Sequence, residues 1–396
     1  MCRKRIVVHL IRKLLPAYAS FIRNQIMNHS RYEARVVYKE RVTSDFANEI
    51  TGSLRSHHCN AGKWGVYKGY SRLLYSRPFR RLTLGDRRNI RSFLISQRAD
   101  ILHFHYGTDA GVFVGATRDL GIPRVVSFYG YDCTSFPNWF FGYGGQYLRK
   151  VFKQVDYCVA MSEDMKADLL GLGCPKSKIF VHYYGTEVSK FVYKRAYNNK
   201  PNITILIVAS LDEKKGHIYL LKSLEKLTKA FKFRLRLRIV GCGPLDEELK
   251  NYVKSCNLEN AVTFVGAHEY LSERFLKEFH DADIFAHPSV IASNGDKEGI
   301  PGTIVEAMAA GLPVVSTYHA GIPYILEHEK TGLLVKERDV DALAASISRL
   351  VLDSELRKRI GQNAQKYALK HLDLRQKQVE LENIYDRVIE EFKTRA

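Results

Sequence analysis

The sequence lacks several features that would assign it to a specialised class of protein. It has no apolar run near the length of about 20 residues that crosses a bilayer. The apolar segment at residues 6–10 is short and is followed by Arg12 and Lys13, so a signal peptide is not expected. The seven cysteines are scattered, odd in number and without a C-x-x-C pair, which favours free thiols in a reducing, cytoplasmic compartment. These absences indicate an ordinary globular protein.

Acidic residues are scarce in one half of the chain only. The formal net charge is +19, and residues 1–200 contain 33 Lys and Arg against 14 Asp and Glu (33 − 14 = 19), whereas residues 201–396 contain 28 of each. Basic and aromatic residues are interleaved between Lys63 and Arg81. Such a surface suits an anionic membrane, a phosphate-bearing substrate, nucleic acid, or plain solvation. No nucleic-acid-binding module is recognisable, so no nucleic-acid partner is expected.

Short apolar runs alternate with amphipathic helical patterns, which predicts parallel α/β sheets. The expected strands are residues 5–10, 33–38, 101–105, 124–128, 157–161, 179–182, 203–209, 235–240, 262–265, 284–287, 313–317 and 332–335. Between Gly185 and Asn202 the periodicity is lost, which indicates a hinge. We therefore expect two Rossmann-like domains, residues 1–190 and 191–372. Beyond Val335 the pattern is helical, and residues 373–396 form a last helix that can pack back on the first domain.

The segment 294–315 carries the densest chemical signal. It follows a strand ending at His287, passes through a glycine-containing loop into an alanine-rich helix, and reaches Gly311, a residue typical of a left-handed helix C-terminus. A strand, loop and helix in this order present backbone N–H groups to a phosphate. Glu298 in the loop and Glu306 in the helix would be costly there unless each binds a neutral polyol. A diphosphate with a sugar on either side meets both requirements.

This segment resembles the E-x7-E region of the family-4 glycosyltransferases, with Glu298 and Glu306 on the two glutamates. Residues 208–216 are similar to the family's G-R-L-x-x-x-K-G loop, and residues 128–132 to its F-H-G-x-D element. The resemblance covers nearly the whole second half and, more weakly, the first. Within the family, the pattern resembles that of the colanic-acid and exopolysaccharide glycosyltransferases.

The resemblance implies a GT-B fold, in which two Rossmann-like domains face each other across a cleft and the second binds the donor. It implies a retaining hexosyltransferase that needs no metal and no cofactor, with a nucleoside-diphosphate sugar as donor substrate. The expected acceptor is a glycan or lipid-linked glycan of cell-surface polysaccharide biosynthesis, exopolysaccharide or lipopolysaccharide. The basic first half suggests peripheral contact with an anionic membrane at its inner face.

The resemblance also implies roles for individual residues. Glu298 would hold sugar hydroxyls, Lys215 would neutralise the diphosphate, and Tyr129 joins them as a catalytic candidate. Glu306 would hold the ribose hydroxyls. Other expected donor-binding residues are Gly299, Ile300, Pro301, Gly302, Thr303, Ser210, Gly241 and Gly243, and expected acceptor-side residues are His105 and Asp132.

Two residues depart from the family pattern. Ser210 stands where the family has an arginine, and Tyr129 stands where it has a histidine. A phenol can donate a hydrogen bond to a hydroxyl or a phosphate, but it is no base near neutral pH. The first loop, at residues 14–18, also lacks a Gly-Gly pair. These departures leave open the alternative of a catalytically weak or inactive GT-B protein with a binding or regulatory role.

Two patterns suggest metal ligands only superficially. Asp281-Ala282-Asp283 is a D-x-D sequence, but it leads directly into an apolar strand. His103 and His105 share one face of a strand, but zinc requires further ligands that the sequence does not place, and lining a cleft is the alternative role. The stretch 57–59 is loop-like and is expected at the surface. We therefore expect no metal site.

Overall fold

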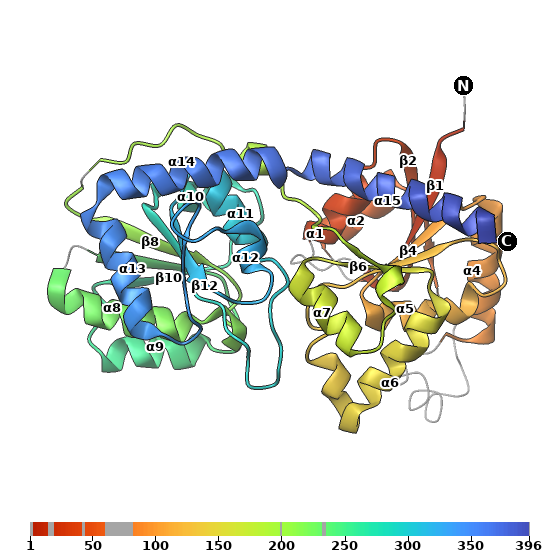
Figure 1. The fold of residues 1–396 in the computed structure, drawn as a ribbon, viewed down its shortest axis with the longest axis horizontal. Coiled ribbons are helices and arrows are strands. Elements are labelled where there is room, and N and C mark those ends of the chain that lie inside the picture. The colour runs from red at the N-terminus through yellow and green to blue at the C-terminus, as the bar shows by residue number, and fades with distance from the viewer. Residues whose placement is uncertain are drawn as a thin grey trace. The chain divides into compact units, whose positions relative to one another are not determined.

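The structure is a computed structural model that describes residues 3–14, 20–41, 44–59, 82–198, 200–231 and 235–395. The interleaved basic and aromatic segment at 63–81 and most of the first loop, 15–18, lie outside the described residues. The chain divides into two compact units (Figure 1). The first unit contains Met1–Met161, Met165–Tyr184 and Lys377–Ala396, and the second contains Ser162–Asp164 and Gly185–Gln376.

The first unit is built on a parallel sheet of seven strands in the order β3-β2-β1-β4-β5-β6-β7. The strands are β1 Arg5–Leu14, β2 Tyr32–Arg41, β3 Ser56–His58, β4 Ile101–His105, β5 Arg124–Ser127, β6 Tyr157–Ala160 and β7 Ile179–Val181. Helices cover both faces of such a sheet, which is why its central strands are almost continuously apolar. The strand order reverses between β1 and β4, the point where ligands bind in open α/β sheets.

The helices of the first unit include one from the far end of the chain. They are α1 Ser20–Met27, α2 Asp45–Ser53, α4 Leu84–Ser96, α5 Gly107–Phe113, α6 Trp139–Gln154, α7 Glu163–Gly171 and α15 Leu374–Arg395. Leu381, Tyr385 and Val388 of α15 are fully buried in the same hydrophobic core as β1 and β4. The C-terminal helix is therefore an integral layer of the first unit.

The second unit contains a parallel sheet of six strands in the order β10-β9-β8-β11-β12-β13. The strands are β8 Ile203–Val208, β9 Leu235–Val240, β10 Val262–Gly266, β11 Ile284–His287, β12 Val314–Thr317 and β13 Leu333–Val335. The helices are α8 His217–Phe231, α9 Asp246–Ser255, α10 Glu273–Asp281, α11 Gly302–Ala309, α12 Ile322–Ile325, α13 Val340–Leu352 and α14 Ser354–His371. Here the order reverses between β8 and β11, so the loops after these two strands meet at the switch point.

Every strand expected from the sequence is confirmed, and one strand was missed. Ser56–His58 forms β3 at the edge of the first sheet, paired with β2. Our expectation of a loop at residues 57–59 is wrong, because His57 and His58 lie in this strand. The expected surface position is confirmed for the exposed His58 but is wrong for Cys59, which is only 6% exposed. Three polar residues without alternation carry no strand signal of their own. The left-handed conformation expected at Gly311 is confirmed by its φ of +72°.

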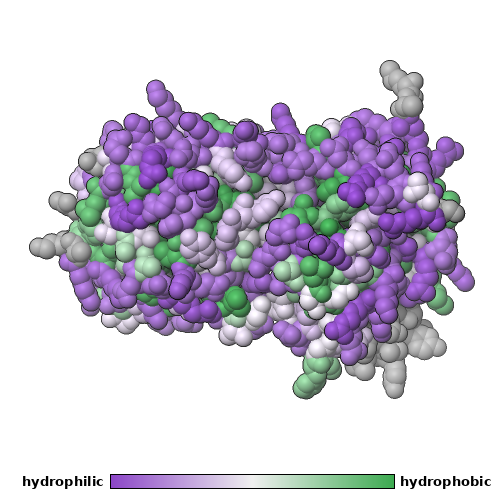
Figure 2. All heavy atoms as spheres, in the orientation of Figure 1, coloured by the Kyte–Doolittle hydropathy of each residue, from purple (hydrophilic) through white to green (hydrophobic). Residues whose placement is uncertain are grey.

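The face of the protein in Figure 2 is mostly hydrophilic. Figure 2 shows one face, on which hydrophobic residues stand in separate groups among charged and polar ones. Within the part of the chain that the structure describes, no helix has both the length and the apolar character that crossing a membrane requires.

Candidate functional site

Two charged side chains meet at the switch point of the second sheet. Lys215 lies in the loop after β8, and Glu298 lies in the loop after β11. The Lys215 Nζ lies 2.7 Å from Glu298 Oε1, with the two side chains 16% and 8% exposed. Neighbouring parallel strands bring their carboxyl ends together, so residues 83 positions apart in sequence become ion-pair partners.

The surrounding charges keep Glu298 ionised. Burial alone would raise the pKa of this carboxyl, but the ammonium groups of Lys215 and Lys214 outweigh burial and lower the pKa to about 2. Lys214 in turn pairs with Asp296, whose Oδ2 lies 2.9 Å from its Nζ. The site therefore holds a buried carboxylate between two cations, which is suited to accepting hydrogen bonds from neutral hydroxyl groups.

A histidine that the sequence analysis did not single out fixes the Glu298 loop. The backbone N–H of Glu298 donates to His319 Nε2 at 3.0 Å, and His319 Nδ1 donates to Glu337 at 2.7 Å. The N–H of Gly321 donates to the carbonyl of Gly299 at 3.1 Å. No motif spacing links His319 or Glu337 to Glu298, so only the folded chain reveals these contacts.

Glu306 lies in α11 in a contrasting environment. Burial raises the pKa of this carboxyl to about 8, and the negative charge of the nearby Glu187 contributes to the rise. A hydrogen bond from Tyr270 acts in the opposite direction and lowers the pKa. Its side chain is 4% exposed, and its Oε2 has no hydrogen-bond partner among the described residues. Buried polar atoms are nearly always paired. Glu306 is thus an unsatisfied acceptor whose charged form a pair of hydroxyl donors would stabilise.

Further unpaired polar atoms surround the Lys215–Glu298 pair. Both ring nitrogens of His217 and of His287, together with the Ser289 hydroxyl, are buried and lack a hydrogen-bond partner among the described residues. Burial and, next, the charge of Lys215 lower the pKa of each histidine to about 3. These side chains are neutral donors and acceptors at the carboxyl edge of the sheet, and neutral polar groups of this kind match a polar ligand.

The structure shows part of the expected arrangement of backbone N–H groups at the start of α11. Pro301 precedes α11, and no side chain caps the helix, whose first residues are Gly302 and Thr303. The first N–H groups of a helix have no partner within it, so they are available to an anion. Ile300 is buried against the protein, at 4% exposure. Contacts of residues 299–303 with a donor remain a prediction.

Gly241 and Gly243 have a role within the protein that the sequence analysis did not foresee. A Cβ atom on Gly241, whose φ is +147°, would lie 1.9 Å from the carbonyl oxygen of Ala209, and one on Gly243 would lie 2.6 Å from the backbone nitrogen of Leu211. The loop after β9 therefore packs directly on the loop after β8. This packing explains both glycines without a ligand, and their contact with a donor stays a prediction, as does that of the exposed Ser210.

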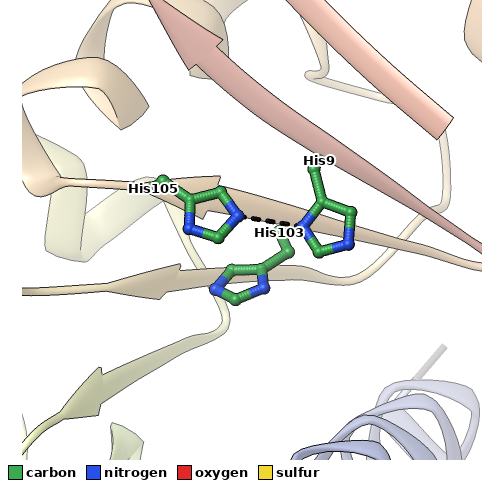
Figure 3. A group of neighbouring side chains, drawn as sticks. All are labelled: His9, His103 and His105. Carbon is green, nitrogen blue, oxygen red and sulfur yellow. Dashed lines mark hydrogen bonds between the residues drawn. The ribbon is translucent and has the colours of Figure 1, made fainter. Parts of the chain in front are cut away.

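The first unit has its own cluster of polar side chains at the β1–β4 junction. His9 on β1 pairs in register with His103 on β4, and His105 ends that strand (Figure 3). All three are fully buried, and potential ligand atoms lie within 4.8 Å of one another. The six nitrogens are, however, already matched in hydrogen bonds, including a direct His9–His105 contact of 2.9 Å. A neutral hydrogen-bonded network fits these distances better than a metal centre.

Tyr129 and Asp132 follow β5 next to this cluster. The Tyr129 hydroxyl lies 2.7 Å from His105 Nδ1. Asp132 is fully buried and accepts the N–H groups of Gly107, Tyr129 and Gly130 at 2.8, 3.0 and 3.2 Å. Burial raises its pKa to about 6, although these N–H groups act to lower it. Asp132 therefore ties the loop that carries Tyr129 to the start of α5.

The D-x-D sequence has ordinary structural partners. Asp283 accepts hydrogen bonds from Lys200 Nζ at 2.7 Å and from the N–H of Thr204 at 2.9 Å, which anchors β8 to the start of β11. Asp281 pairs with Lys277 one helical turn earlier, at 2.9 Å.

Comparison with known proteins gives consistent matches over both units. Residues 190–367 match the family model described as Glycosyl transferases group 1, and residues 32–190 match that of Glycosyltransferase Family 4. The putative colanic acid biosynthesis glycosyltransferase WcaL of Salmonella typhimurium is 34% identical over 253 residues, covering 63% of this chain and 61% of that protein. The amylovoran biosynthesis glycosyltransferase AmsK of Erwinia amylovora is 36% identical over 259 residues, covering 64% and 61%. The match spans less than two thirds of these relatives' length.

Solved structures agree in fold. Anabaena Alr3699/HepE in complex with UDP has a TM-score of 0.76 at 17% identity, covering 97% of this chain and 100% of that one. The same protein in complex with UDP-glucose has a TM-score of 0.74 at 18% identity, covering 96% and 99%. At such low identity the likeness establishes the fold alone.

Proposed function

Because the chain belongs to the family-4, group 1 glycosyltransferases and has their GT-B fold, we propose that it transfers a hexosyl group from a nucleoside-diphosphate sugar to a glycan. The proposed reaction retains the anomeric configuration and uses no metal. Its place is cell-surface polysaccharide biosynthesis, as the names of WcaL and AmsK suggest for those relatives.

The observation that carries this proposal is the buried ion pair of Lys215 with Glu298 in the second unit, together with the unsatisfied carboxyl of Glu306 in the same unit. Lys215 supplies positive charge for a diphosphate, and Glu298 accepts hydrogen bonds from hydroxyls of the transferred sugar. Glu306, with its unpaired Oε2, accepts those of the ribose. UDP and UDP-glucose bound to HepE, a protein of the same fold, are consistent with this ligand class.

The chemistry requires charge stabilisation on the leaving group. When the bond from the sugar to the phosphate breaks, negative charge builds on the nucleoside diphosphate, and fixed dipoles or cations must meet it. Lys215, as a cation, and the uncapped N–H groups at the start of α11 are the groups that we propose for this role. Once the diphosphate draws the ammonium of Lys215, the Glu298 carboxylate is freer to hold the sugar.

Isothermal titration with UDP-, GDP- and dTDP-sugars tests the donor site directly. Wild-type protein should bind at least one of them, and Glu306→Gln should bind it more weakly. Glu355→Gln is the matched control, because Glu355 is 82% exposed on α14. Binding accompanied by neither transfer nor slow hydrolysis of the nucleotide sugar would favour the catalytically inactive alternative, to which Ser210 and Tyr129 point.

For the acceptor we propose a lipid-linked glycan at an anionic membrane face. The start of α6 carries three adjacent aromatic side chains, Trp139, Phe140 and Phe141, which are 41%, 65% and 105% exposed. Phe140 and Phe141 have φ values of +54° and +56°. This left-handed conformation costs roughly 1–2 kcal/mol per residue for a side chain other than glycine, and strain of this kind concentrates at functional sites.

The charge of α6 and of the first half of the chain supports a lipid partner. Arg149, Lys150 and Lys153 are exposed on the same helix, and the whole excess of positive charge lies in this half of the chain. Helices that carry exposed aromatic and basic side chains are typical of segments that lie at the interface of anionic membranes. A membrane contact here would hold the enzyme beside a lipid-borne acceptor.

A further inference from the structure

Five buried side chains of the first unit form a continuous hydrogen-bonded chain from α15 to Tyr129. Glu382 Oε1 lies 3.2 Å from His29 Nδ1, and His29 Nε2 lies 3.0 Å from His9 Nε2. His9 Nδ1 lies 2.9 Å from His105 Nε2, and His105 Nδ1 lies 2.7 Å from the Tyr129 hydroxyl. The His9–His105 contact is the dashed line in Figure 3.

The three imidazoles in this chain are neutral. Burial lowers the pKa of His9, His29 and His105, and the neighbouring histidines lower those of His9 and His105 further. A neutral imidazole has one N–H and one lone pair. Each contact must therefore join a donor to an acceptor, and the direction chosen at one end of the chain fixes every contact up to the other end.

Glu382 sets that direction. Burial would raise its pKa, but hydrogen bonds from His29, Ser30 and Arg31 lower it to about 2, so the group is a carboxylate that only accepts. The carboxylate requires the proton of His29 on Nδ1. A charge-assisted bond of this type is about twice as strong as a neutral one.

Gln378 is a competing neighbour of His29, but its position does not reverse this direction. Its amide nitrogen lies 2.8 Å from His29 Nδ1 and 3.3 Å from Nε2. An atom nearly equidistant from both ring nitrogens lies over the ring face, whereas the lone pair points outward in the ring plane. The amide also donates to the Gln25 carbonyl at 3.2 Å. The in-plane partner of Nδ1 is therefore Glu382.

The remaining contacts follow from this start. His9 donates from Nε2 to His29, His105 donates from Nε2 to His9, and His105 Nδ1 is left as an acceptor. The Tyr129 hydroxyl must then donate its proton inward to His105, and its oxygen faces the other side as an acceptor. The Gln25 amide, at 3.5 Å, is a weak donor to that oxygen. His103 is bonded to Tyr385 and Ser127, and Ser127 also hydrogen-bonds the Tyr129 hydroxyl. A Ser127 hydroxyl that donates to Tyr129 agrees with the direction of the chain and takes one of the two lone pairs of the Tyr129 oxygen.

We propose that Glu382, acting through His29, His9 and His105 as positioning residues, fixes the Tyr129 hydroxyl as a hydrogen-bond acceptor that receives a sugar hydroxyl and disfavours phosphate. This inference rests on the proposed function for the presence of a sugar substrate. The sequence-based expectation was that the Tyr129 hydroxyl can donate to a hydroxyl or to a phosphate. With its proton directed to His105, the Tyr129 oxygen can only accept from a ligand. A phosphate oxygen without a proton would face the lone pair of the Tyr129 oxygen, whereas a sugar hydroxyl can donate to it. Tyr129 thereby does what an unprotonated imidazole nitrogen would do at the same position.

Nitrogen-15 NMR of histidine-labelled protein tests the direction without any substrate. In the wild type, His105 should be protonated on Nε2, and Glu382→Gln should shift it toward the Nδ1 tautomer. The matched control is Glu390→Gln, an exposed residue of the same helix, which should change nothing. A wild-type His105 protonated on Nδ1 would overturn the proposal.

A second variant covers the case in which Glu382→Gln does not fold. Tyr129→Phe removes the hydroxyl at the end of the chain, and the wild-type His105 tautomer should persist, because the direction comes from the carboxylate. A tautomer that changes in Tyr129→Phe would show that Tyr129 sets the direction, against the proposal.

NMR titrations with three ligands identify which hydroxyl group donates to Tyr129. With carbon-13 at its phenol carbon, Tyr129 should respond to UDP-glucose if the hydroxyl belongs to the donor sugar, or to methyl glucoside if it belongs to the acceptor, and not to inorganic phosphate. A response to phosphate alone contradicts the proposal, as does a response to none of the three when calorimetry shows that UDP-glucose binds. Absence of nucleotide-sugar binding in calorimetry, with the expected tautomers intact, counts against the proposed function only.

Discussion

Lys215 and Glu298 follow the two strands between which the order of the second sheet reverses, and they meet there in a buried ion pair of 2.7 Å. If Lys215 binds a diphosphate as proposed, the Glu298 carboxylate supplies the balancing negative charge while that ligand is absent. Removing either partner leaves the other charge buried and uncompensated, which destabilises the folded protein. The contribution of the pair can therefore be measured from the free energy of unfolding as well as from kinetics.

Glu298→Gln should lower the free energy of unfolding by about 3 kcal/mol, because Lys215 loses its partner in a largely buried position. Urea unfolding measures this loss, with the exposed Glu355→Gln as control. UDP should then raise the melting temperature of the variant more than that of the wild type, since the diphosphate replaces the missing charge. Turnover should fall more than UDP affinity. Unchanged stability and an unchanged UDP response would show that the pair is energetically unimportant.

Lys215→Ala should weaken binding of UDP more than binding of UMP. The ammonium is proposed to neutralise the diphosphate, and UMP lacks the second phosphate on which most of that charge resides. Calorimetric titration of both nucleotides provides the comparison, and Lys229→Ala, at a position 76% exposed, is the control. Equal losses for UDP and UMP would place Lys215 away from the diphosphate.

UDP affinity should rise with pH between 7 and 9 and then level off. Burial raises the pKa of Glu306 to about 8, opposed by Tyr270 and assisted by Glu187, so the free carboxyl is mostly protonated at pH 7. Ribose hydroxyls bind the carboxylate better, so binding releases a proton, and affinity changes by at most about tenfold per pH unit. Glu306→Gln should bind weakly and without this slope. A pH slope that persists in Glu306→Gln would assign the titration to another group.

Replacing Phe140 and Phe141 by serine should reduce binding to phosphatidylglycerol vesicles while leaving the melting temperature nearly unchanged. Both side chains are exposed, so little is lost from the protein interior. Co-sedimentation in low and high salt separates the aromatic from the electrostatic contribution. Leu352→Ser changes an equally exposed apolar residue, at 70% exposure on α13, and should have no effect. Equal binding to phosphatidylcholine vesicles would remove the electrostatic argument.

The regular part of the fold follows from local sequence, and the exceptions have physical causes. Central strands such as β6 and β8 are mostly apolar because both faces of a parallel sheet are covered, and such apolar runs can be recognised in the sequence. β3 could not be predicted from its own residues, because Ser56, His57 and His58 form a strand only by pairing with β2. The pairing of Lys215 with Glu298 could be anticipated only through the family resemblance.

The hydrogen-bonded networks of polar side chains could not be predicted from patterns in the sequence. His319 holds the Glu298 loop from the segment that follows β12, and Glu382 contacts His29 across 353 positions of sequence. Such contacts depend on which side chains converge after the sheets have formed. The exposure of Phe140 and Phe141 was likewise not predicted, because the sequence does not indicate the left-handed backbone of these two residues.

The return of α15 to the first core has a consequence for biosynthesis. Leu381, Tyr385 and Val388 emerge from the ribosome only after the whole second unit has been made. During translation the second unit can complete its hydrophobic core first. The first unit, although synthesised earlier, keeps an exposed hydrophobic face until α15 has been made. A nascent chain stalled just before α15 should therefore present that face to chaperones.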